Sequence, residues 1–170
     1  MLIYLVGMPS SGKSTLGKQL ASALGFDFID LDAEIVKREQ QTISEIFAKK
    51  GESYFRKVEK EILENTLPQK PTIIATGGGT PCFFENMKFL NKHGISVFIE
   101  QPLTILSQRI TRTNERPLWN KKGVQQIEKE LEISYKKRLP FYQQANICFE
   151  TAMTFETLLA KIQQQLQKND

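Results

Sequence analysis

The chain has 170 residues, of which 40% are hydrophobic and 25% are charged, with a formal net charge of +4 at pH 7; this is typical of one globular domain over residues 1–170 and excludes a second catalytic domain. The basic residues are scattered along helical segments beside glutamates, so the surplus does not predict nucleic-acid binding. The apolar stretches are only strand-sized and the start lacks the pattern of a signal peptide, so we expect a cytoplasmic protein without a membrane segment.

The first predicted strand, residues 2–6, runs directly into the sequence GMPSSGKST at residues 7–15. This is the P-loop spacing, in which glycines let backbone N–H groups close around phosphates, a lysine reaches the outer phosphates and a hydroxyl serves Mg²⁺. Apolar residues then recur at helical spacing up to Gly25, so the loop would lie at a helix N-terminus, where an anion is favoured. The pattern predicts a nucleoside triphosphate site made of Gly7, Ser10, Ser11, Gly12, Lys13, Ser14 and Thr15.

The second predicted strand, residues 27–30, is followed closely by two aspartates, Asp30 and Asp32. Two residues apart on an extended chain, their side chains would point the same way. One would then serve the metal and the other a substrate hydroxyl. The alternative is that Asp32 simply caps a helix that begins at Ala33.

Three successive glycines, Gly77, Gly78 and Gly79, follow the third predicted strand, residues 72–75. Glycines in a row cost chain entropy and contribute no packing, so a close approach of the backbone to a ligand is favoured over a plain tight turn. Two more strands are predicted at residues 95–99 and 146–149. The alternation of strands and helices predicts a parallel sheet that is covered on both faces and binds ligands at the carboxyl ends of its strands.

The remaining signals come from a loop, the arginines and the cysteines. Residues 111–123 are polar and broken by a proline and a glycine, and a loop of this length in a compact domain is usually functional or mobile. The chain holds only six arginines, and their planar forks suit carboxylate and phosphate, which favours arginines at anion sites. Cys82 and Cys148 stand far apart without a CxxC motif, which predicts neither a zinc site nor a disulfide.

Six motifs together make the chain resemble the shikimate kinases, and the joint pattern is far more specific than the P-loop alone. They are the P-loop, DLD at residues 30–32, GESYFRKVE at 51–59, TGGG at 76–79, RPL at 116–118 and KRLPFY at 137–142. The resemblance covers the chain to about Glu150. Ser10 departs from it, because the family often has a further glycine there, and the segment after Glu150 shows no clear match to the family's adenine loop.

The resemblance implies an α/β, three-layer P-loop kinase fold of the nucleoside-monophosphate-kinase type. Its five-stranded parallel sheet would have the order 2-3-1-4-5, flanked by helices. A shikimate-binding helical segment would lie at residues 31–65 and a mobile lid at residues 111–123. The implied reaction transfers the γ-phosphate of ATP to the 3-hydroxyl of shikimate with the help of Mg²⁺, and we expect a monomer.

The resemblance also assigns residues to the acceptor. Asp32 matches the residue that binds the shikimate hydroxyls, including the one that attacks. Arg56 and Arg138 match a pair of arginines on the shikimate carboxylate, and Glu59 holds Arg56 in place. The glycines after the third strand would offer backbone groups to the ring substituents; they are Gly77, Gly78 and Gly79.

On the nucleotide side, the resemblance assigns Asp30 to the Mg²⁺ environment together with Ser14. Arg116 matches the lid arginine that reaches the transferring phosphate, and Arg109 matches a residue that stacks on adenine. This agrees with the chemistry, because phosphoryl transfer needs cationic groups such as Lys13, Mg²⁺ and a lid arginine to neutralise developing charge. The expected catalytic residues are therefore Lys13, Asp32 and Arg116.

Rival functions stay open at this point. A gluconate-kinase-like sugar kinase shares the P-loop and the fold, although the aspartate pair, the three glycines, Arg56 and Arg138 favour a cyclic hydroxy-acid acceptor. A nucleotide kinase would need a second base-binding site, for which the sequence shows no feature. A catalytically inactive ATP-dependent binding protein of the same fold is disfavoured by the complete set of catalytic residues. A switch GTPase would need an NKxD-type sequence, which is absent.

Overall fold

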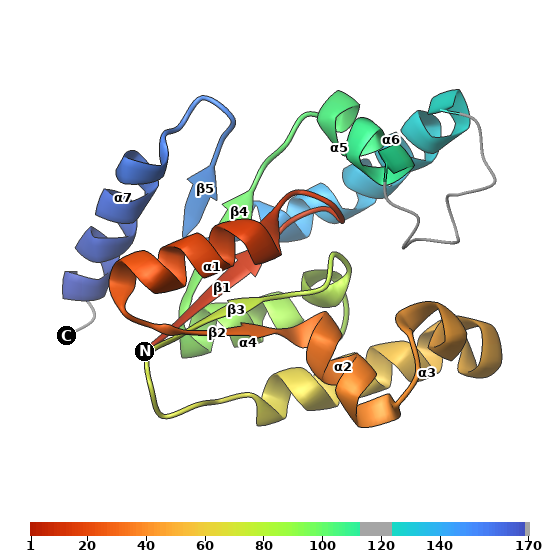
Figure 1. The fold of residues 1–170 in the computed structure, drawn as a ribbon, viewed down its shortest axis with the longest axis horizontal. Coiled ribbons are helices and arrows are strands. Elements are labelled where there is room, and N and C mark those ends of the chain that lie inside the picture. The colour runs from red at the N-terminus through yellow and green to blue at the C-terminus, as the bar shows by residue number, and fades with distance from the viewer. Residues whose placement is uncertain (113–123, 169–170) are drawn as a thin grey trace.

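The structure, a computed structural model, describes residues 1–112 and 124–168 (Figure 1). Within these residues, five strands form one parallel sheet in the order β2-β3-β1-β4-β5, which confirms the predicted order. The strands are β1 (Leu2–Val6), β2 (Asp27–Asp30), β3 (Thr72–Ala75), β4 (Ile95–Ile99) and β5 (Ile147–Phe149). Four strands have the predicted bounds, and β5 begins one residue later than predicted.

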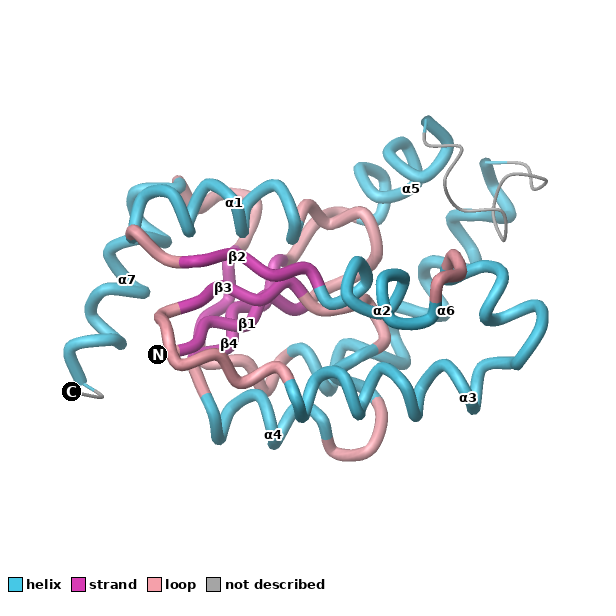
Figure 2. The backbone as a smooth tube through the Cα atoms, turned by 60° about the horizontal axis from the view of Figure 1, so that its bottom comes forward, coloured by secondary structure: helices cyan, strands magenta, loops and turns pink. Residues whose placement is uncertain are grey.

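Helices connect the strands throughout the described ranges. They are α1 (Lys13–Leu24), α2 (Leu31–Glu39), α3 (Ile43–Asn65), the short 3₁₀ helix η1 (Thr80–Cys82), α4 (Asn86–His93), α5 (Leu103–Arg112), α6 (Val124–Tyr142) and α7 (Phe155–Lys168). The pair α2 and α3 extends beyond the carboxyl end of β2 and packs together there (Figure 2). The expected substrate-binding segment, residues 31–65, consists of this pair.

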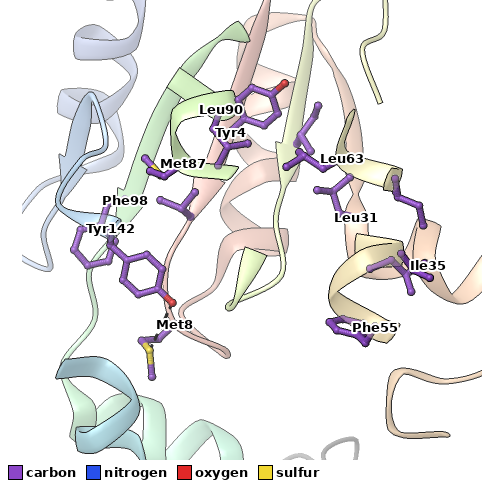
Figure 3. Close-up of a cluster of buried hydrophobic side chains, with 14 of the residues drawn as sticks. Tyr4, Met8, Leu31, Ile35, Phe55, Leu63, Met87, Leu90, Phe98 and Tyr142 are labelled. Carbon is purple, nitrogen blue, oxygen red and sulfur yellow. Dashed lines mark hydrogen bonds between the residues drawn. The ribbon is translucent and has the colours of Figure 1, made fainter. Parts of the chain in front are cut away.

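Side chains of the central strand β1 alternate between the two faces of the sheet. Leu2, Tyr4 and Val6 pack into a core shared with α2, α3, α4 and α6 (Figure 3). Ile3 and Leu5 pack into a second core shared with α1 and α7. Because both faces are covered, β1 is apolar at every position, as buried parallel strands usually are. The sheet is thus the middle of three layers, and Figure 2 shows it between α1 and α4.

Local signals at the helix ends explain where the helices lie, with one difference from the prediction. Helix α1 ends at Gly25, whose φ of 69° is the left-handed cap that glycine favours. Helix α2 begins at Leu31, earlier than predicted, because Asp30 is its N-cap and accepts a hydrogen bond from the backbone N–H of Asp32. The capping role considered for Asp32 is therefore wrong, and Asp32 lies in the first helical turn rather than on an extended chain.

Helix α3 is bent at one residue. It starts with a capping box between Thr42 and Glu45, in which each side chain bonds the backbone N–H of the other. At Gly51 the backbone leaves the helical region, with φ 81° and ψ 170°. Glycine tolerates this conformation, so a second helical piece begins directly after the bend.

Candidate active site

The P-loop joins β1 to α1 and closes on its own lysine. Lys13 Nζ donates to the carbonyl oxygens of Gly7 at 3.0 Å and Met8 at 2.8 Å. A side chain at Gly7 would begin 2.7 Å from a backbone oxygen of β4, so glycine is required there. Ser10, the departure from the family pattern, has a φ of 64°, a left-handed conformation that a glycine would adopt without strain.

The two aspartates meet different partners. Ser14 Oγ donates to Asp30 Oδ2 at 2.5 Å, and Asp30 Oδ1 accepts from the backbone N–H of Asp32 at 3.1 Å. Asp30 therefore ties the first turn of α1 to the first turn of α2. The Asp32 carboxylate lies instead over the loop after β3, because a side chain at Gly77 would begin 2.8 Å from Asp32 Oδ1.

The three glycines are surrounded by side chains of the site. A side chain at Gly77 would also begin 2.7 Å from Glu59 Oε1, and one at Gly79 would begin 2.6 Å from both terminal nitrogens of Arg56. At Gly78 the obstacle is Pro9 of the P-loop, at 2.7 Å. The backbone of the three glycines is thus approached closely by protein side chains, among them charged groups of the site, and the approach of a ligand stays a prediction.

Arg56 is buried and held from several sides. Its Nη1 donates to Glu59 Oε2 at 2.8 Å, and the other oxygen of Glu59 accepts from the Thr80 hydroxyl at 2.6 Å. Its Nη2 and Nε donate to Glu52 Oε1 at 3.1 and 3.3 Å. The ring of Phe83 lies against the guanidinium, 4.3 Å from centroid to Cζ. The expected contact between Glu59 and Arg56 is therefore present.

Tyr142, at the end of α6, connects Arg138 to the glycine loop and the P-loop. Its hydroxyl donates to the Gly78 carbonyl at 2.6 Å and lies 3.7 Å from Met8 Sδ (Figure 3). The ring stacks on Phe98 at 5.1 Å between centroids. Burial raises the pKa of Tyr142, and the charge of Arg138 partly opposes this shift. The hydroxyl therefore stays protonated and donates at neutral pH.

A cavity of about 480 Å³ opens between η1, the bend of α3 and one side of α6. Its walls are Glu52, Cys82, Phe83, Glu130, Ile133, Ser134, Lys137, Arg138 and Phe141. Burial raises the pKa of the Cys82 thiol to about 11, opposed by the positive charges of Arg138 and Arg56. Both arginines thus act electrostatically on one cavity wall.

Two predicted nucleotide contacts have different outcomes. Arg109, on α5, donates from Nη1 to the Ser10 carbonyl at 3.0 Å, so it lies beside the P-loop. Arg116 and most of the predicted lid lie outside the described residues, and Thr111 and Arg112 belong to the last turn of α5.

Three residues of the site were not predicted from the sequence, namely Glu52, Phe83 and, in its present role, Tyr142. The signal available for Glu52 was its i,i+4 spacing from Arg56.

A P-loop after the central strand of a parallel sheet, with acidic and arginine groups gathered at the neighbouring strand ends, defines a P-loop kinase. The family model for shikimate kinase matches residues 9–167. The chain therefore belongs to the shikimate kinase family.

Individual relatives agree with this assignment over most of the chain. A shikimate kinase from Persephonella marina is 43% identical over 149 residues, covering 88% of this chain and 88% of the relative. The crystal structure of a shikimate kinase from Bacteroides thetaiotaomicron has a TM-score of 0.89 at 34% identity and covers 98% of each chain. A shikimate kinase from Acinetobacter baumannii in complex with shikimate has a TM-score of 0.85 at 37% identity, covering 99% of this chain and 94% of that one.

Among residues 1–112 and 124–168, no helix is long and apolar enough to span a membrane.

Proposed function

We propose that this chain transfers the γ-phosphate of ATP to the 3-hydroxyl of shikimate, giving shikimate 3-phosphate and ADP. The observation that carries the proposal is that Arg56 and Arg138 both lie close enough to act electrostatically on Cys82 in the cavity wall, while Gly78 packs on Pro9 of the P-loop. Two arginine forks suit a small carboxylate, and the P-loop supplies the phosphate donor beside it. Membership of the shikimate kinase family supports the same acceptor.

Asp32 is the proposed base for the attacking hydroxyl. Its carboxylate lies against the loop after β3, and Asp30 rather than Asp32 is the N-cap of α2. A carboxylate placed there accepts the hydroxyl proton as the oxygen attacks. Gly77, Gly78 and Gly79 are proposed to offer backbone groups to the same ring.

Lys13, Arg109 and Arg116 are the proposed cations for the phosphates. Lys13 is held at the mouth of the P-loop by two carbonyl oxygens, which a phosphate would replace as the partner of the ammonium group. Arg109 already contacts the P-loop backbone at Ser10, next to where we propose that adenine binds. Arg116 is proposed from its motif alone.

Mg²⁺ is the proposed metal, held by Ser14 and Asp30. The hydroxyl and carboxylate oxygens of these residues lie 2.5 Å apart at the start of α1, and oxygen ligands are the ones Mg²⁺ prefers. In the described part of the chain there is no cluster of three or more metal-binding side chains. A pair fits, because Mg²⁺ usually takes one or two protein groups together with substrate phosphates and water. When bound, Mg²⁺ would neutralise charge on the phosphates.

A cytoplasmic, monomeric enzyme that binds no nucleic acid is part of the same proposal. The pairing of basic residues with glutamates within single helices supports the last part of this proposal, the absence of nucleic-acid binding. Lys60 pairs with Glu64 and Lys136 pairs with Glu132, each at i,i+4 spacing. Such pairs belong to a solvated surface rather than to a polyanion-binding stripe.

A panel of acceptors tests the proposal. ADP release from Mg·ATP is measured with shikimate, gluconate, a nucleoside monophosphate or no acceptor. We expect release with shikimate alone. Release with gluconate and not with shikimate would favour a sugar kinase, and binding of ATP without any transfer would favour an inactive binding protein.

A further inference from the structure

The carboxylate-binding edge of Arg56 is already occupied by a carboxylate of the chain. Glu52 Oε1 accepts from both Nη2 and Nε of Arg56, at 3.1 and 3.3 Å. These two nitrogens form one edge of the guanidinium fork, which is the geometry that takes a carboxylate side-on. Glu52 therefore occupies the guanidinium edge that the carboxylate of the acceptor would bind.

Glu52 is not required to orient Arg56. Glu59 is 1% exposed, holds Nη1 at 2.8 Å, and is itself fixed by the Thr80 hydroxyl. The rings of Phe83 and Phe55 lie 4.3 and 5.0 Å from the guanidinium carbon. The contacts with Glu59 and the two rings leave Arg56 little freedom to move, so they are sufficient to fix its position without Glu52.

Exposure differs sharply between the two partners. The Glu52 side chain is 56% exposed and lines the cavity, whereas the Arg56 side chain is 9% exposed. Arg56 is not among the described residues that form the cavity wall. A ligand that enters the cavity therefore meets Glu52 before it can reach the arginine.

We propose that Glu52 is a displaceable internal carboxylate that covers Arg56 until the carboxylate of the acceptor replaces it. This inference rests on the proposed function and names a residue that sets acceptor specificity. Exchange of one carboxylate for another keeps the buried guanidinium paired throughout, which avoids the cost of an uncompensated charge. An acceptor without a carboxylate cannot make this exchange, so Glu52 stays on Arg56 and disfavours the binding of that acceptor.

The position of Glu52 in the chain suits this role. It directly follows the bend at Gly51, so it begins the second helical piece of α3. A glutamate in a first turn interacts favourably with the helix dipole whether or not it contacts Arg56. Rotation of its side chain away from the cavity therefore leaves α3 intact.

The test is a calorimetric titration of the full-length protein with shikimate and, separately, with Mg·ADP. The variant is Glu52→Gln, which keeps the shape and removes the charge. Glu64→Gln is the matched control, because Glu64 pairs with Lys60 at i,i+4 spacing on the same helix, away from the cavity. We expect E52Q to tighten shikimate binding by roughly three- to tenfold, because a competing ion pair is removed, with Mg·ADP binding unchanged. E64Q is expected to change neither.

The methyl ester of shikimate separates competition from a general loosening of the cavity. The ester lacks the charge that competes for Arg56, so its binding should gain less from E52Q than shikimate binding does. Glu52→Ala, which removes the side chain altogether, should tighten shikimate binding in the same sense, and melting curves of each variant check its fold.

Weaker or unchanged shikimate binding in folded E52Q and E52A would overturn the inference, and so would equal gains for shikimate and its ester. Absence of shikimate binding by the unsubstituted protein would instead overturn the proposed function, and the inference with it.

Discussion

Arg56→Lys should separate acceptor binding from nucleotide binding. The guanidinium of Arg56 makes three hydrogen bonds to two carboxylates, at 2.8, 3.1 and 3.3 Å, and its carbon lies 4.3 Å from the Phe83 ring. A lysine ammonium is a point charge that cannot serve Glu59 and a second carboxylate through a planar fork. Because Glu59 is buried, the lysine is expected to pair with Glu59 and to lose the acceptor.

The expected loss of shikimate affinity can be estimated from that geometry. One hydrogen bond between charged groups contributes about 1.5–3 kcal/mol, which corresponds to a rise of roughly 10- to 150-fold in the dissociation constant for shikimate. Nucleotide binding should be unaffected, because the guanidinium of Arg56 bonds Glu52 and Glu59 on its own helix rather than the P-loop. Both constants are measured by calorimetry, with KM values from steady-state assays as a second readout.

Arg38→Lys is the control for this substitution. Arg38 lies on α2 and pairs with Glu61 at 2.7 Å on the surface, so its replacement should leave both ligands unchanged. If R56K bound shikimate normally, or lost ATP affinity instead, the assignment of Arg56 to the acceptor's carboxylate would be refuted.

Three further predictions follow from the site. Asp32→Asn should lower kcat by roughly 10²- to 10⁴-fold with nucleotide binding retained; near-normal turnover of the folded variant would remove Asp32 as the base. Gly79→Ala should weaken shikimate binding and cost about 1–3 kcal/mol of stability by overpacking. The added methyl carbon would lie 2.6 Å from the terminal nitrogens of Arg56, which would have to move to an ordinary contact distance of 3.4 Å. An unchanged melting temperature and unchanged shikimate binding would contradict this. Burial raises the pKa of Cys82 to about 11, so the thiol is protonated at neutral pH. The rate of its alkylation, measured by mass spectrometry, should therefore rise about tenfold for each pH unit between about pH 8 and 10. A rate that no longer rises above pH 8 would contradict the raised pKa.

The sequence predicted the positions of the strands well because their signals are local, whereas the order of the strands was predicted from the family resemblance. Most strands are short apolar runs, although β2 begins and ends with an aspartate, and the P-loop and Gly25 mark the ends of β1 and α1 by their residue types. The start of α2 was missed, since Asp30 and Asp32 are both good caps and the sequence does not say which one caps. In the structure Asp30 caps and also accepts from Ser14, a contact between segments 16 residues apart.

The site was predictable only where a motif names the residue. The sequence singles out Gly77 and Gly79 as glycines, but it does not reveal the side chains that crowd them in the fold, which are Asp32, Glu59 and Arg56. Tyr142 is a further example, because its bond to Gly78 joins residues 64 positions apart. The role of Arg116 stays a prediction, since it lies outside the described residues.

The central claim is the transfer of phosphate from ATP to one hydroxyl of shikimate. The most direct measurement is phosphorus and proton NMR of the product formed from Mg·ATP and shikimate. We expect one ADP for each shikimate consumed, and a new phosphate whose phosphorus couples to the ring proton at carbon 3. ADP accompanied only by inorganic phosphate, or a phosphate on another hydroxyl, would contradict it.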